Sequence, residues 1–61
     1  MDTSKVRVTM TGSRNGSWIV SLSEFRANHD SLTVSRLEKY GSATWERMYM
    51  NAFLKFKGEL L

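Results

Sequence analysis

The chain has 61 residues, with nine Lys and Arg against six Asp and Glu, a net charge of +3 and an isoelectric point near 9.7. It has no cysteine, which excludes disulfides and thiolate metal sites. Its single histidine cannot form a metal site by itself. No apolar run is long enough to cross a membrane, and the first ten residues lack the apolar core of a signal peptide. We therefore expect one small domain over residues 1–61, intracellular and most simply cytoplasmic, with no cofactor and no membrane association.

The first part of the chain predicts a β-hairpin. Residues 5–11 ("KVRVTMT") alternate apolar and polar side chains, which is the pattern of a half-buried strand. Asn15-Gly16 is a favoured pair for a hairpin turn. Residues 17–24 form the second predicted strand. Its apolar face consists of Trp18, Val20 and Leu22.

The second part predicts a further strand and a helix. Residues 32–38 suit a third strand because they include β-branched side chains, although their alternation is imperfect and a helix is the alternative. Residues 43–57 predict an amphipathic helix, with Ser42 as its N-cap and Gly58 as its stop. The apolar stripe of this helix has helical spacing and comprises Trp45, Met48, Tyr49, Ala52, Phe53 and Phe56.

These elements predict an α+β fold in which a three-stranded antiparallel sheet packs on one C-terminal α-helix, in the order β-β-β-α. The expected core joins the apolar face of the sheet to the helix stripe. Its members are Val6, Val8, Trp18, Val20, Leu22, Trp45, Tyr49, Phe53 and Phe56. The second face of the sheet remains open to solvent.

No group of residues suggests catalysis, so we do not expect an enzyme. His29 and Asp30 are neighbours in a predicted turn, and such neighbours rarely converge on a substrate. The "TGSRNG" stretch lacks the spacing and the lysine of a phosphate-binding loop.

The open sheet face predicts contact with duplex DNA. A basic surface suits a polyanion, and a β-ribbon fits the major groove, where Arg and Lys contact phosphates or guanine and Ser, Thr and Asn contact phosphates or bases. An ordinary solvated face is the alternative, and the charge alone also serves solubility. The candidate DNA-binding residues are Lys5, Arg7, Thr9, Arg14, Asn15, Ser21, Ser23, Arg26, Arg36 and Lys39.

A few apolar residues near the C-terminus lie off the helix stripe and suggest a contact with protein. They are Met50, Leu54, Leu60 and Leu61. They are either ordinary scattered surface residues or a patch for a homodimer or a protein partner. The alternative function is therefore a small inhibitor or adaptor that binds a protein through this patch or through an edge strand.

Three stretches resemble the ethylene-response-factor (APETALA-two type) DNA-binding domain and its relatives in integrase arm-type domains and phage or mobile-element proteins. "GSWIV" (residues 16–20) looks like the family's "G-K-W" hairpin, and "LEKYGS" (37–42) looks like its "L-G-x-F-x-T". "MYMNAFLKFKG" (48–58) looks like its helix "A-Y-x-x-A-A-x-K-x-x-G". The resemblance implies three strands on one helix, and duplex DNA bound by the sheet face in a phage or mobile-element protein of transcription regulation. Ser21 and Ser23 stand where the family's second strand carries Glu and Arg, so the resemblance implies no particular DNA target sequence.

Overall fold

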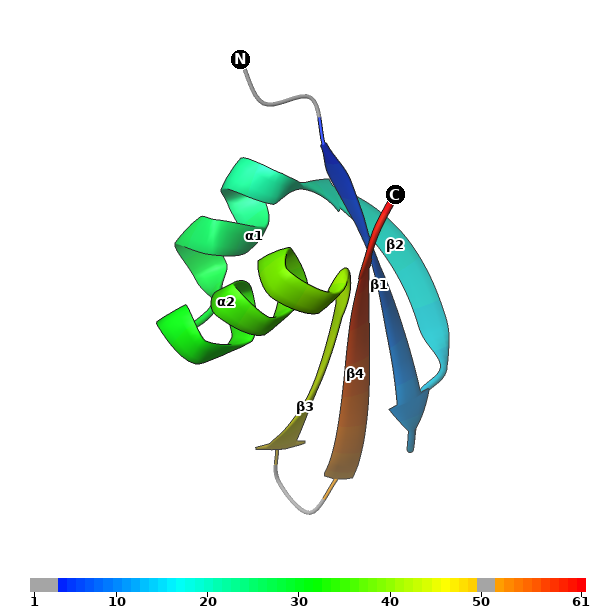
Figure 1. The fold of residues 1–61 in the computed structure, drawn as a ribbon. Coiled ribbons are helices and arrows are strands. Elements are labelled where there is room, and N and C mark those ends of the chain that lie inside the picture. The colour runs from blue at the N-terminus through cyan, green and yellow to red at the C-terminus, as the bar shows by residue number, and fades with distance from the viewer. Residues whose placement is uncertain (1–3, 50–51) are drawn as a thin grey trace.

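The computed structural model describes residues 4–49 and 52–61, whose elements follow the order β-β-α-α-β-β (Figure 1). The strands are β1 (Lys5–Gly12), β2 (Gly16–Ser21), β3 (Ser42–Tyr49) and β4 (Ala52–Leu60). The helices are α1 (Leu22–Asn28) and α2 (Ser31–Tyr40). The strands form one antiparallel sheet in the order β2-β1-β4-β3, so the two central strands come from opposite ends of the chain. The fold is α+β as expected, but the prediction of three strands and one C-terminal helix is wrong.

The predicted first hairpin is confirmed, but its second strand is shorter than the prediction of 17–24. β1 and β2 pair from Lys5↔Ser21 to Met10↔Gly16. The chain leaves the sheet at Ser21. The side-chain hydroxyl of Ser21 accepts a hydrogen bond from the backbone N–H of Glu24 at 3.2 Å. This N-cap starts α1 at Leu22, because the hydroxyl satisfies a backbone donor that a helix leaves unpaired.

The predicted third strand over 32–38 is wrong. These residues belong to helix α2, and a helix was the alternative prediction for them. Asp30 caps its N-terminus by accepting a 2.7 Å hydrogen bond from the backbone N–H of Thr33. Hydrogen bonding from the side chain and then the backbone of Thr33 lowers the pKa of the Asp30 carboxyl. At the other end Gly41 has a φ of 78° and donates its backbone N–H to the carbonyl of Leu37 at 2.8 Å. Caps at both ends favour a helix over the β-branched character of this segment.

Replacing Gly41 with alanine should destabilise the protein by about 1 kcal/mol, since an L-residue resists the left-handed conformation. A Cβ at Gly41 meets nothing within 4 Å, so backbone strain is the whole effect. Urea unfolding followed by circular dichroism measures it. Gly16→Ala is the matched control, because Gly16 has no positive φ and its added Cβ only reaches ordinary contact with Met10. Equal midpoints for the two variants would contradict the left-handed cap.

The predicted helix over 43–57 is wrong, because its described residues lie in the paired strands β3 and β4. Trp45 and Phe56 are direct cross-strand partners, and their rings stack with centroids 5.5 Å apart. Met48 and Phe53 pair on the opposite face, where they are 67% and 62% exposed. Residues three apart share a side of a helix but lie on opposite faces of a strand, so the apparent stripe divides between two faces.

Gly58 is therefore not a helix stop but an inner residue of β4, between Val8 of β1 and Ala43 of β3. An added Cβ would lie 3.3 Å from the Trp45 ring and 3.4 Å from the Phe25 ring. The missing side chain lets two aromatic rings lie directly on the sheet. The three-strand fold that the family resemblance implies is consequently not the fold of this chain.

Both helices lie on one face of the sheet, which we call the inner face, at the end where β1 begins and β4 finishes (Figure 1). The buried core comprises Val6, Val8, Leu22, Phe25, Leu37, Ala43, Leu54 and Phe56. Val6, Val8, Leu22 and Phe56 were predicted, whereas Trp18 and Phe53 are exposed and the fully buried Leu37 was missed. Within residues 4–49 and 52–61, no helix has the length and apolar character that a membrane crossing requires.

Candidate functional site

The open face is the side of the sheet opposite the helices. On the central strands it carries residues of β1 and β4 that alternate with the buried ones. Arg7 lies opposite Glu59, Thr9 opposite Lys57, and Thr11 opposite Lys55. The residues of the whole open face are Lys5, Arg7, Thr9, Thr11, Ser17, Ile19, Ser21, Ser42, Thr44, Glu46, Met48, Phe53, Lys55, Lys57 and Glu59.

The open face has a surplus of two positive charges, because four cations face two carboxylates. Lys57 Nζ lies 2.9 Å from Glu59 Oε1, and Lys55 Nζ lies 3.7 Å from Glu46 Oε1. A hydrogen bond from Lys57 and its charge lower the pKa of the Glu59 carboxyl, and Arg7 adds to this effect. Exposed ion pairs of this kind contribute roughly 0–1 kcal/mol each to stability. A phosphate could therefore replace the carboxylate as the partner of a lysine with little loss of stability.

A hollow of about 270 Å³ lies on the open face between the lysines. Its lining comprises Thr9, Thr11, Thr44, Lys55, Phe56 and Lys57. The Thr11 hydroxyl reaches the carbonyl of Lys55 at 3.5 Å, a long hydrogen bond that leaves it available to a better acceptor. The surface inside the hollow is almost wholly apolar, so the hollow itself offers few donors to a phosphate.

The structure divides the predicted DNA-binding residues among three places. Lys5, Arg7, Thr9 and Ser21 lie on the open face, although the Ser21 hydroxyl already caps α1. Arg14 and Asn15 lie in the turn between β1 and β2. The rest lie on the helices and not on the sheet: Ser23, Arg26, Arg36 and Lys39. Among these, Arg26 pairs with Glu38 across the two helices.

The open-face residues of β3 and β4 that escaped the prediction include Thr44, Lys55 and Lys57. They were missed because residues 43–57 were interpreted as a helix. The signal was present in "LKFKGEL" (residues 54–60), where apolar or glycine positions alternate strictly with charged ones. In a strand this alternation turns both lysines to the same face.

The predicted partner patch does not form a common surface among its described members. Leu54 is buried in the core, and Leu60 is partly buried against it. Leu61 is exposed, and Met50 lies outside the described residues. The exposed apolar side chains on the open face of the sheet are instead Ile19, Met48 and Phe53.

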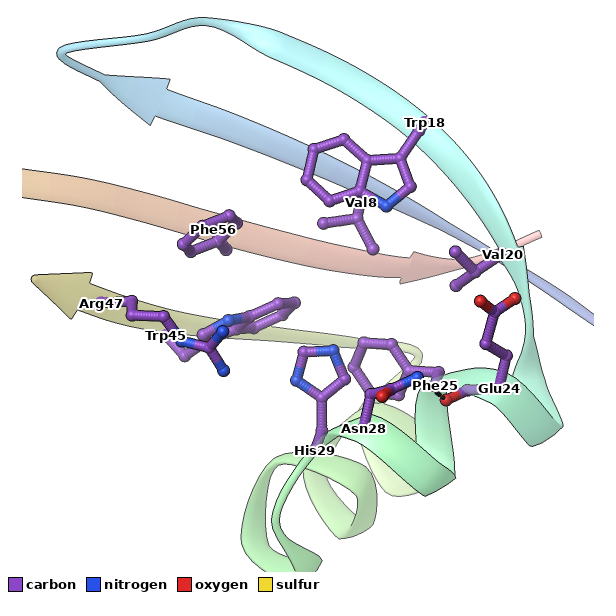
Figure 2. A pocket seen from close by; sticks show the side chains of 10 residues that line it. All are labelled: Val8, Trp18, Val20, Glu24, Phe25, Asn28, His29, Trp45, Arg47 and Phe56. Carbon is purple, nitrogen blue, oxygen red and sulfur yellow. Dashed lines mark hydrogen bonds between the residues drawn. The ribbon is translucent and has the colours of Figure 1, made fainter. Parts of the chain in front are cut away.

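A second hollow, the aromatic pocket, lies on the inner face beside the helices and has a volume of about 330 Å³ (Figure 2). Its apolar walls are Val8, Trp18, Val20, Phe25, Trp45 and Phe56. Its polar members are Glu24, Asn28, His29 and Arg47. The Trp18 ring meets Phe56 edge-on at 6.4 Å, and Phe56 in turn stacks on Trp45. The sequence predicted Trp18, Trp45 and Phe56 in one core but assigned Trp45 and Phe56 to a helix, whereas the three residues lie on three different strands.

His29 is packed between rings of the aromatic pocket. Its imidazole stacks on Phe25 with centroids 4.0 Å apart and meets Trp45 edge-on at 4.7 Å. Burial lowers the pKa of His29 and the charge of Arg47 lowers it further, while Asp30 acts in the opposite direction. In the described part of the chain no three His, Asp or Glu residues gather to hold a metal. The His29 ring is thus part of the pocket lining and packs against Phe25 and Trp45.

Stability should fall as the pH drops below about 6.5, the ordinary pKa of an unfolded histidine. The pKa of His29 is lower in the folded protein than in the unfolded chain. Between these two pKa values the unfolded chain binds more protons, so a falling pH favours unfolding. Urea midpoints measured from pH 8 to pH 5 test this. His29→Phe keeps an aromatic ring without a titrating group and should remove this step. The same slope in both proteins would show that His29 does not cause it.

Comparison with protein-family models, curated proteins and solved structures found no match to this chain. The open face and the aromatic pocket are therefore interpreted from their own chemistry.

Proposed function

We propose that this protein is a small DNA-binding module that contacts duplex DNA with the open face of its sheet. The observation that carries the proposal is the pairing of β1 with β4. This pairing gathers Arg7, Lys55 and Lys57 from opposite ends of the chain on the two central strands, on a face that neither helix covers. We further propose a regulatory or accessory role of the kind that phages and mobile elements encode.

The dimensions of the central strands suit the major groove. Neighbouring strands lie about 4.8 Å apart, so the side chains of β1 and β4, the two central strands of the four-stranded sheet, project from a band narrower than a groove about 12 Å wide. Side chains two residues apart on one strand are separated by about 6.8 Å, which spaces Lys55 and Lys57 along the groove. Thr9 and Thr11 lie opposite these lysines and add hydroxyl donors. Phosphate contacts by these groups would position the two strands.

Fluorescence anisotropy with a labelled random-sequence duplex, measured at several salt concentrations, tests the proposal. The logarithm of the binding constant should fall linearly with that of the salt concentration, by about 0.9 per phosphate contact. Lys55→Ala with Lys57→Ala removes two open-face charges, so it should weaken binding and reduce the slope by about 1.8.

Arg36→Ala with Lys39→Ala is the matched control, because it removes the same charge from α2 on the other side of the sheet. It should keep most of the affinity and the slope. Equal losses in the two double variants would contradict the open face, and binding insensitive to salt would contradict a phosphate-based interaction altogether.

A second candidate function, a protein-binding adaptor or inhibitor, is favoured by β2. This strand is an edge of the sheet, and its Trp18 and Ile19 are 43% and 55% exposed. An edge strand can accept an added strand from a partner, with side chains such as these giving specificity. Binding of this kind would tolerate salt, so the same salt series distinguishes it from DNA binding.

A further inference from the structure

The aromatic pocket is a separate site from the open face, because it lies on the opposite side of the sheet. Its volume of about 330 Å³ is at the lower end of the range for ligand pockets, which suits one or two fused rings. Figure 2 shows Trp18 on one side of the pocket and Trp45 with His29 on the other. A flat ring between them would contact aromatic surfaces on both sides.

The pocket is also polarised. Arg47 lies at one end, beside Trp45, and Glu24 lies at the other end, beside Val20 (Figure 2). The two charges sit on separate elements, Arg47 on β3 and Glu24 on α1. A bound ring therefore meets a cation at its Trp45 end and a carboxylate at its Val20 end.

We propose that the aromatic pocket binds a small planar aromatic ligand that carries a carboxylate or similar anionic group. The ring lies between Trp18 and Trp45, and the anionic group lies at Arg47. A guanidinium suits this role because it donates two parallel hydrogen bonds to a carboxylate. A cationic ligand would instead place its charge at Glu24, and the net charge of +3 disfavours its approach.

The two tryptophans of the chain both line this pocket, so intrinsic tryptophan fluorescence reports on it directly. Three probes share one ring and one chain length and differ in charge: 3-phenylpropanoate, 3-phenylpropanol and 3-phenylpropylamine. The acid should bind at least about tenfold more tightly than the alcohol, as expected of charge-assisted hydrogen bonds, and the amine should bind most weakly.

Arg47→Gln should reduce the affinity for 3-phenylpropanoate to that for the alcohol, while leaving the alcohol unchanged. Arg36→Gln on α2 is the charge-matched control and should bind the acid as the unaltered protein does. Urea midpoints for both variants confirm that they are folded. Lys55→Ala with Lys57→Ala should also bind the acid normally, which separates this inference from the proposed DNA binding.

Three results would overturn the proposal: equal affinity for all three probes, tightest binding of the amine, or no fluorescence change with any probe at millimolar concentration. Tightest binding of the amine would assign the pocket instead to a cation held by Glu24 and the aromatic rings.

Discussion

Phe25→Ala is expected to leave much of the protein unfolded at room temperature. Phe25 is 1% exposed, and its ring packs on His29, Trp45 and the bare backbone of Gly58. Removing such a ring from a core costs about 3–5 kcal/mol. The whole stability of a chain of this length is about 3–9 kcal/mol at the usual value per residue, so the loss is comparable with the total.

Chemical denaturation followed by circular dichroism measures the effect, and Phe53→Ala is the matched control. Phe53 is on the open face and 62% exposed, so its replacement should change stability by less than about 0.5 kcal/mol. The pair also distinguishes the β3–β4 hairpin from the helix that the apolar spacing predicted. If Phe53→Ala were as damaging as Phe25→Ala, the helical arrangement of residues 43–57 would be favoured instead.

Arg7→Glu combined with Lys57→Glu is expected to weaken binding to duplex DNA by at least about a hundredfold. Each replacement turns an attractive contact with phosphate into a repulsive one, and the two positions lie on the paired central strands. The reversed residues also join Glu59, which lies opposite Arg7, so the middle of the open face becomes acidic. Anisotropy titration at low salt measures the loss.

The control for this pair is Arg36→Glu with Lys39→Glu on α2, which changes the net charge equally. It should lose far less affinity, because those side chains lie on the helix side of the sheet. Urea midpoints check that both double variants are folded. A loss as large in the α2 variant would mean that overall charge, and not the open face, governs binding.

The first hairpin was predictable because its signals are local. Strict alternation from Lys5 to Met10 and the Asn15-Gly16 pair specify strand, turn and strand within a short stretch. The candidate residues of β1 were therefore placed on the correct face. The end of β2 was predicted too late because Ser21 caps α1, and a serine fits either the polar face of a strand or a helix cap.

The structure of residues 43–57 was not predictable in the same way, because their apolar positions fit both the period of a helix and the period of a strand. Trp45, Phe53 and Phe56 have helical spacing, while Leu54 and Phe56 also fit a strand that alternates with lysines. The pairing of β4 with β1 decides between them, and it joins residues at opposite ends of the chain, such as Val6 and Leu60. A local pattern contains no information about that pairing, which buries the alternating face of β4.

Candidate site residues were predicted correctly where the secondary structure was predicted correctly, and were missed where it was not. Lys5, Arg7 and Thr9 came from the correct first strand, whereas Lys55 and Lys57 were hidden by the helix interpretation. The aromatic pocket depends on sheet order, since Trp18 and Trp45 lie on the two opposite edge strands. Only the assembled sheet brings those rings to the same hollow.

Backbone amide shifts mapped by NMR as duplex DNA is added would locate the proposed DNA-binding surface on the open face. The largest shifts should fall on β1 and β4, around Arg7, Thr9 and Lys57, while α1 and α2 change little. Largest shifts on α2, around Arg36 and Lys39, would contradict the proposal and assign DNA binding to the helix side of the sheet.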